Sequence, residues 1–150
     1  MASVLTINGR RYIERYQDIV FETAFTVANQ VKRDQRLSLP GQGPFLAKAL
    51  KGTTLLTATG VPAVRRYKFK FGNTDGGIWY STQGLGGTND RVVDTMIVGT
   101  AQFPKIFTPP ILYQSNAAIL MEFESLVADV DFTVYLSFEG SLLFPAPEGM

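Results

Sequence analysis

Two residue types that carry much of protein chemistry are missing from this chain of 150 residues, which has no cysteine and no histidine. The lack of cysteine excludes disulfides, thiolate metal sites and cysteine nucleophiles. The lack of histidine removes the commonest general base and the commonest metal ligand, so Ser-His-Asp and Cys-His catalysis are excluded. We therefore predict a protein that is not an enzyme and that uses no cofactor and no metal.

Charge and long apolar runs are also scarce. Charged residues make up 18% of the chain, against about 25% in typical globular domains. No segment approaches the roughly 18 consecutive apolar residues of a membrane span, and the start "MASVLTINGRRY" lacks the pattern of a secretory signal. We expect no membrane partner. The 45% hydrophobic and 12% aromatic content favours one folded domain over disorder.

The few charges are unevenly distributed along the chain. Residues 1–70 carry a net charge of +8 and residues 71–150 carry −7, which leaves +1 overall. Either the basic half meets an acidic partner, or the two halves interleave in one sandwich and neutralise each other. A total of +1 is weak for general nucleic-acid binding. In "RRYKFKF" (65–71) the aromatic and cationic residues fall on opposite strand faces, so we predict no nucleic-acid partner.

Strict alternation of apolar and polar residues predicts strands in the second half. In "DFTVYLSFEG" (131–140) every second residue from Phe132 to Phe138 is apolar, and Gly140 is expected to end the strand. "SLLF" (141–144) is expected to add a short strand or edge. In residues 118–124 the apolar residues from Ile119 to Phe123 face away from Glu122 and Glu124. Tyr67, Phe69 and Phe71 form a third such face.

The first half is ambiguous. Residues 12–37 fit a helix, with Ile13, Tyr16 and Val20 on one face, but they also fit alternation. We favour strands, because β-branched and aromatic residues are dense there and the rest of the chain is β. About eight to ten short segments predict an all-β, antiparallel β-sandwich or jelly-roll-like single domain. Its parts would be an N-terminal arm or first strands (1–25), the sandwich (26–144) and a short C-terminal tail (145–150).

Two carboxylate pairs, Glu122/Glu124 and Asp129/Asp131, have a spacing that could serve glycoside hydrolysis. The same spacing arises on any strand face that points to solvent, so they are not predicted to be catalytic. The segment "FPKIFTPPILYQ" (103–114) combines apolar residues with prolines that cannot donate ladder hydrogen bonds. It is expected to be an extended connector at a sandwich edge, with Phe107 either capping the core or facing a neighbouring subunit.

Candidate partner-contact residues are of types enriched at interfaces, chiefly arginine and aromatic residues. A cluster near the N-terminus could form an ordered arm that docks on another subunit. A Trp-Tyr pair flanks a loop-rich region, where it could stack on a sugar or anchor a partner. The candidates are Arg10, Arg11, Tyr12, Arg15, Tyr16, Trp79, Tyr80 and Phe107.

The order of these features resembles small structural proteins of tailed-bacteriophage virions, in particular the β-sandwich cement or decoration proteins that bind capsid shells. The likeness spans about residues 26–144. It lies in "VANQVKRDQRLSLP" followed by "GPFLAKALKG", then "VRRYKFKFGNTDGGIWYST", "FPKIFTPPILYQSNAAILMEFES" and "DFTVYLSFEGSLLF". Pro44 departs from the pattern, which has an acidic residue before the position of Phe45. No functional residue is carried over from it.

The resemblance implies a non-enzymatic protein that binds and stabilises the shell of the major capsid protein, in many copies. Its partners would be the major capsid protein and other copies of itself, as a dimer or trimer. It would be made in the host bacterial cytoplasm and reside on the capsid surface of the virion. The alternative is a tail- or fibre-associated module that recognises a host surface glycan through Trp79 and Tyr80.

Overall fold

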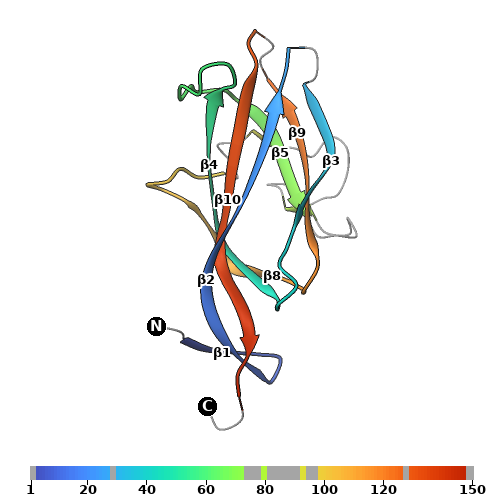
Figure 1. Ribbon diagram of the computed structural model, residues 1–150, viewed down its shortest axis with the longest axis vertical. Helices are drawn as coiled ribbons and strands as arrows, with labels where there is room; N and C mark the ends of the chain where they lie inside the picture. The colour runs from blue at the N-terminus through green and yellow to red at the C-terminus, as the bar shows by residue number, and fades with distance from the viewer. Residues whose placement is uncertain are drawn as a thin grey trace.

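The computed structural model describes residues 3–27, 30–72, 79–80, 92–93, 98–126 and 129–147. These residues form ten strands, β1 to β10, and contain no helix, so the described part has none that could cross a membrane. The strands make two antiparallel sheets packed face to face in a single domain (Figure 1). This confirms the predicted all-β sandwich.

Five strands form each of the two sheets. The first sheet has the order β1-β2-β10-β4-β8, and the second has the order β3-β9-β5-β6, with β7 also pairing with β5. The bounds of the first sheet are β1 Ser3–Ile7, β2 Arg10–Phe25, β10 Phe132–Pro145, β4 Phe45–Leu56 and β8 Lys105–Tyr113. The bounds of the second are β3 Val31–Ser38, β9 Ala118–Ser125, β5 Tyr67–Gly72, β6 Trp79–Tyr80 and β7 Val92–Val93.

The strand order is that of a jelly roll once β1 is set aside. Strands pair from the outside of the sequence inward, β2 with β10, β3 with β9, β4 with β8 and β5 with β6. From β2 to β10 the chain therefore changes sheet at six of its eight connections. Such double-sheet jelly rolls occur in viral capsid and lectin domains.

Aromatic side chains fill the space between the sheets. The Phe123 ring on β9 lies 4.8 Å from Phe69 and 6.0 Å from Tyr67, measured between ring centroids. It also lies 6.1 Å from both Phe21 and Phe25 on the first sheet. Phe123 thus contacts rings of both sheets in the core.

The predicted alternations are confirmed. Alternate residues of β9 from Ile119 to Ser125 are buried, and Phe132, Val134, Leu136 and Phe138 all lie in the core. Gly140 does not end its strand, however, because β10 continues to Pro145. The pairing of β10 with β4 shifts register between Glu139 and Gly140. A Cβ at Gly140 would collide with the carbonyl oxygen of Leu46, so glycine permits the close approach of two backbones.

The ambiguous N-terminal segment is a strand. β2 runs for 16 residues and pairs with all 14 residues of β10, so tertiary pairing decides in favour of the β pattern. The prediction of a connector was wrong for the proline-rich segment, because Lys105–Tyr113 form β8, the strand at the end of the first sheet. Its register against β4 shifts between Ala47 and Ala49. Prolines are tolerated there because an edge strand has one side without ladder bonds.

Lys70 is buried, at 2% exposure, although the alternation of β5 places it on the face opposite the aromatic residues. Its ammonium nitrogen lies 3.0 Å from a carboxylate oxygen of Glu122, the residue directly opposite on β9. An ion pair in this position satisfies two charges that would otherwise be costly to bury.

Replacing Phe123 with alanine is expected to lower the free energy of unfolding by about 3–5 kcal/mol, because it opens a cavity where both sheets meet. Urea denaturation measures the loss. Phe103→Ala is the control, since that ring is 78% exposed, and its effect should stay within about 0.5 kcal/mol. Similar losses for the two variants would contradict the described core.

Lys70→Met alone is expected to cost about 3–5 kcal/mol, because it leaves the Glu122 carboxylate without its cation. The double variant Lys70→Met/Glu122→Leu should recover most of that loss, since no unpaired charge remains. Denaturation of the two single variants and the double variant measures the coupling. A double variant as unstable as the sum of the single variants would show that the two residues act independently.

Candidate functional site

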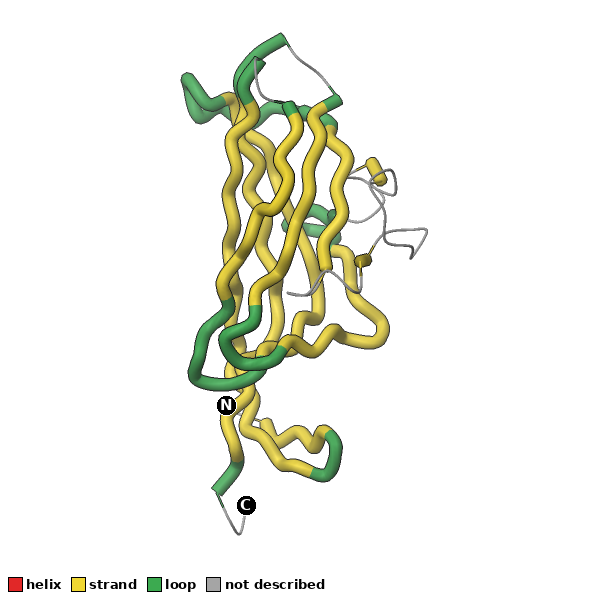
Figure 2. Tube along the Cα trace, turned by 90° about the vertical axis from the view of Figure 1, so that its right-hand side faces the viewer, coloured by secondary structure: helices red, strands yellow, loops and turns green. Residues whose placement is uncertain are grey.

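A three-stranded extension projects from one end of the sandwich. It consists of residues 3–16, which are β1 and the start of β2, and residues 141–147 at the end of β10. Figures 1 and 2 show it at the lower end, beyond the body of the sandwich, with both chain termini nearby. We call it the basic extension, because three of its exposed side chains are arginines, namely Arg10, Arg11 and Arg15.

A tight hairpin turn forms the tip of the basic extension. Asn8 and Gly9 connect β1 to β2, with φ values of 51° and 78°, and Ile7 pairs with Arg10 across the turn. Positive φ at both central residues is the mark of a type I′ turn, for which Asn-Gly is the preferred sequence. The sequence reasoning missed this hairpin, although the Asn8-Gly9 dipeptide was the signal that would have found it.

Contacts between strands order the basic extension, and one of them, from Lys48, joins it to the sandwich. The Arg15 guanidinium lies 5.2 Å from the centre of the Phe144 ring, a cation–π contact. The Lys48 ammonium on β4 lies 2.8 Å from the Glu14 carboxylate. The backbone N–H of Ala146 donates to the carbonyl of Arg11 over 2.9 Å. The extension is therefore an ordered outgrowth of the first sheet.

Five of the eight predicted contact residues come together on this extension. Arg10, Arg11, Arg15 and Tyr16 are exposed, and Tyr12 is half-buried. Arg10 and Tyr12 line a cleft of about 240 Å³ together with Pro44 and Leu143. The Arg/Tyr cluster seen in the sequence thus lies on one ordered strand, with Arg10, Tyr12 and Tyr16 on one face and Arg11 and Arg15 on the other.

Tyr16 marks the junction of the extension with the sandwich. The side chain is 71% exposed, and a hydrogen bond to the Asp18 carboxylate raises the pKa of Tyr16 to about 12. The charge of Asp18 acts in the same direction, because it repels the phenolate. Tyr16 therefore presents a neutral hydroxyl over the whole physiological range of pH.

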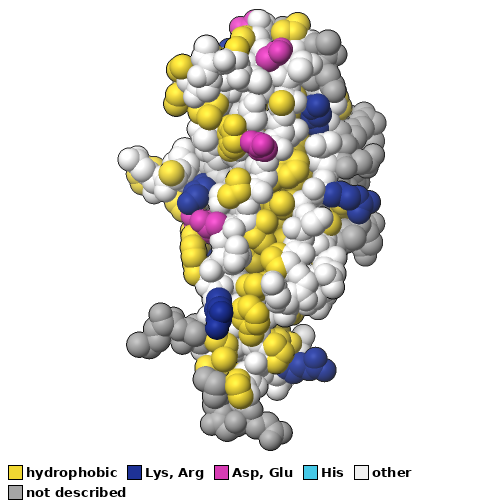
Figure 3. All heavy atoms as spheres, in the orientation of Figure 1, with side chains coloured by type: hydrophobic (Ala, Val, Ile, Leu, Met, Phe, Trp, Pro, Cys, Tyr) yellow, Lys and Arg dark blue, Asp and Glu magenta, His cyan; other side chains and the backbone are white. Residues whose placement is uncertain are grey.

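An apolar band crosses the outer face of the first sheet. Figure 3 shows hydrophobic side chains running along this face over β2 and β10, with charged side chains on both sides of them. Its exposed members include Tyr16 at 71% and Val20 at 61%. Exposed apolar surface of this kind is typical of interaction sites.

The remaining predicted residues are not brought to the extension. Phe107 is half-buried and packs on the core, with its ring centroid 5.5 Å from that of Phe71. Of the two predicted alternatives, this is the one in which Phe107 caps the core. The exposed ring of that segment is Phe103, which was not singled out from the sequence. Trp79 and Tyr80 form β6 opposite Gly72 and Phe71, and their side chains lie outside the described part.

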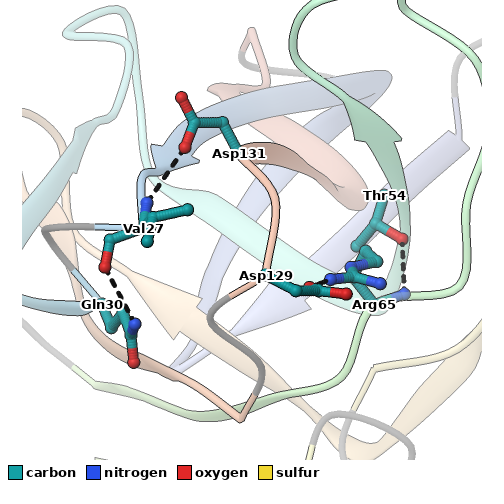
Figure 4. A network of polar contacts seen from close by, with 6 residues as sticks. All are labelled: Val27, Gln30, Thr54, Arg65, Asp129 and Asp131. Atoms are coloured by element: carbon teal, nitrogen blue, oxygen red, sulfur yellow. Dashed lines mark hydrogen bonds and ion pairs between the residues drawn. The ribbon is translucent and has the colours of Figure 1, made fainter.

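The other end of the sandwich carries a polar network that joins loops (Figure 4). Arg65 forms an ion pair with Asp129, and its backbone N–H donates to the Thr54 hydroxyl over 3.2 Å. Asp131 accepts from the backbone N–H of Val27 over 3.0 Å. Asp129 and Asp131 thus have structural partners, as Glu122 has in Lys70. Among the described residues no cluster of three or more acidic side chains is arranged to hold a metal ion.

Comparisons with protein-family models, with curated proteins and with solved structures give no significant match for this chain.

Asp18→Asn is expected to lower the pKa of Tyr16 from about 12 toward 10, because the neutral amide no longer disfavours the phenolate. The phenolate absorbance during an alkaline titration measures it, as the difference between each protein and the same protein carrying Tyr16→Phe. Glu22→Gln is the control and should leave the titration of Tyr16 unchanged. An unchanged pKa of Tyr16 in the Asp18→Asn variant would contradict the hydrogen bond between the two side chains.

Proposed function

We propose that this chain is a structural protein of a tailed-bacteriophage virion, a capsid cement or decoration protein that binds and stabilises the shell of the major capsid protein. The observation that supports this most is a jelly roll that carries an ordered, arginine- and tyrosine-rich extension on one end. The fold by itself is an analogy, because jelly rolls serve several functions. The extension adds a surface of the composition found in protein interfaces.

The basic extension is the proposed shell-binding element. Its three exposed arginines would meet an acidic surface on the capsid, and Tyr12 and Tyr16 would supply apolar contact area with a polar tip. Because the extension is ordered by the β2–β10 ladder, docking costs it little conformational entropy. This favours tight binding through a small area.

The size of the chain suits a protein that holds several subunits together. It exposes 8415 Å² of surface, and a standard interface uses about 800 Å² per partner. Contacts with several capsid subunits can therefore be made at once, and linked weak contacts strengthen one another through effective concentration. Stabilisation of the shell then needs no strong single contact.

Purified protein is expected to co-sediment with undecorated capsid shells and to raise their melting temperature. Arg11→Glu should weaken this binding by roughly tenfold, as expected for loss of an interface arginine. Lys105→Glu is the matched control, because it reverses one exposed charge on β8, away from the extension. Equal binding by Arg11→Glu and Lys105→Glu would reject the extension as the docking element, and no binding by the unaltered chain would reject the function.

Lectin domains share the jelly-roll architecture, so glycan recognition by a tail- or fibre-associated module is the rival proposal. A glycan array separates the two. Specific glycan binding that is lost in Trp79→Ala, together with no affinity for shells, would favour the rival.

A further inference from the structure

The first sheet leaves one long backbone edge open. β1 pairs with β2 only between Arg10 and Glu14, whereas β10 pairs with β2 from Tyr12 to Phe25. Residues 15–25 of β2 therefore pair on one side only within the described part of the chain. An unpaired edge of this length is a template for another strand.

The register identifies the backbone groups that point to this edge. Ile7 and Arg10 flank the two-residue turn, so their backbones exchange hydrogen bonds. The backbone N–H and C=O groups of Arg10 therefore point toward β1. Arg11 points the other way, since its carbonyl accepts from Ala146 beside the end of β10. The even-numbered residues from Tyr16 to Ala24 thus direct their N–H and C=O groups to the open edge. Their side chains lie on the outer face of the sheet.

Among the described strands, β3 provides a second open edge on the same side of the sandwich. It is the end strand of the second sheet, and Figure 1 shows it next to the upper part of β2. The backbone N–H of Leu39 donates to the carbonyl of Ala117, just before β9, over 3.0 Å. At this end of β3, odd-numbered residues therefore direct their backbone N–H and C=O groups toward β9. Arg36 and Ser38 therefore direct their backbone N–H and C=O groups to the open edge. Both residues are exposed.

The two edges are complementary in charge. The open part of β2 carries Asp18 and Glu22 on its outer face, and the corresponding face of β3 carries Arg36. Asp18 and Glu22 are thus the anionic side chains that Arg36 of a second copy would meet. Pairing β2 with a second β2 around Val20 would instead place Asp18 opposite Glu22, which is unfavourable.

We propose that two copies of this chain associate about a two-fold axis parallel to the strands, with β2 of each copy pairing with β3 of the other. β2 and β3 run in opposite directions in one chain, so such an axis makes both new pairings antiparallel. The interface is isologous and each contact occurs twice. Both basic extensions then lie at the same end of the dimer, where they can bind one surface together. The dimer itself does not depend on the proposed shell binding.

Sedimentation of the full chain at low salt tests the association. The unaltered chain is expected to form a dimer. Asp18→Lys and Arg36→Glu should each raise the dissociation constant by about tenfold or more, because each places like charges together. The double variant Asp18→Lys/Arg36→Glu should restore the dimer. A chain that stays monomeric at the highest accessible concentration, or a double variant no better than the single ones, would overturn the proposal.

A proline variant tests the backbone pairing. The N–H of Val20 points to the open edge, so Val20→Pro removes a donor of the new ladder without touching the bonds to β10. It should abolish dimerisation and leave the melting temperature of the monomer nearly unchanged. Should the variant unfold, the charge reversals still decide the question. A folded Val20→Pro that dimerises normally would overturn the pairing.

Crosslinking distinguishes this arrangement from others. Because the chain has no cysteine, single cysteines introduced as Val20→Cys and Arg36→Cys report on one contact each. Oxidising a mixture of the two variants should give a disulfide-linked heterodimer, and neither variant alone should crosslink. Self-crosslinking of Val20→Cys would reveal β2–β2 pairing and would contradict the proposal.

Discussion

The ladder between β2 and β10 is the interaction on which the rest of the molecule depends. All 14 residues of β10 pair with β2. One continuous ladder therefore joins the aromatic core to the basic extension. Between Phe25 and Ile19 the ladder lies over the aromatic core. Between Tyr16 and Tyr12 it leaves the core and carries the basic extension. The extension is therefore as much a part of the sheet as the core strands are.

The same ladder accounts for the surface features. Because β2 is longer than the partner strand β1 supplied by the N-terminal hairpin, part of its outer edge is left without a ladder. Alternation along β2 then places Tyr16, Asp18 and Val20 together on the outer face. Within the described part of the chain, one long strand thus contributes the basic extension, an apolar band and an open edge.

Local pattern was sufficient to predict the fold class and much of the core. The alternations ending in Phe71, Phe123 and Phe138 were predicted correctly, because period-two burial is a local property of a strand in a sandwich. The Arg/Tyr cluster was recognised from residue type alone. What local pattern could not give was the length of β2, because helical and strand spacing both fit that segment until its partner β10 is known.

Other features depend on contacts between distant segments. Gly140 was interpreted as the end of a strand, whereas the neighbouring backbone at Leu46 explains it as a close approach. The burial of Lys70 follows from the ion pair with Glu122, which alternation along a single strand cannot reveal. The nested strand order likewise arises from pairings across the whole chain. The Asn8-Gly9 turn was the exception, since it was readable from the sequence and was overlooked.

Electron microscopy of capsid shells with bound protein tests the central claim most directly, which is that an ordered jelly roll binds a shell through its basic extension. The account predicts sandwich-sized density standing on the shell, absent from undecorated particles, with the β1–β2 hairpin end against the capsid surface. Density attached through the opposite end of the sandwich, where Arg65 and Asp129 lie, or no density on the shell at all, would contradict it.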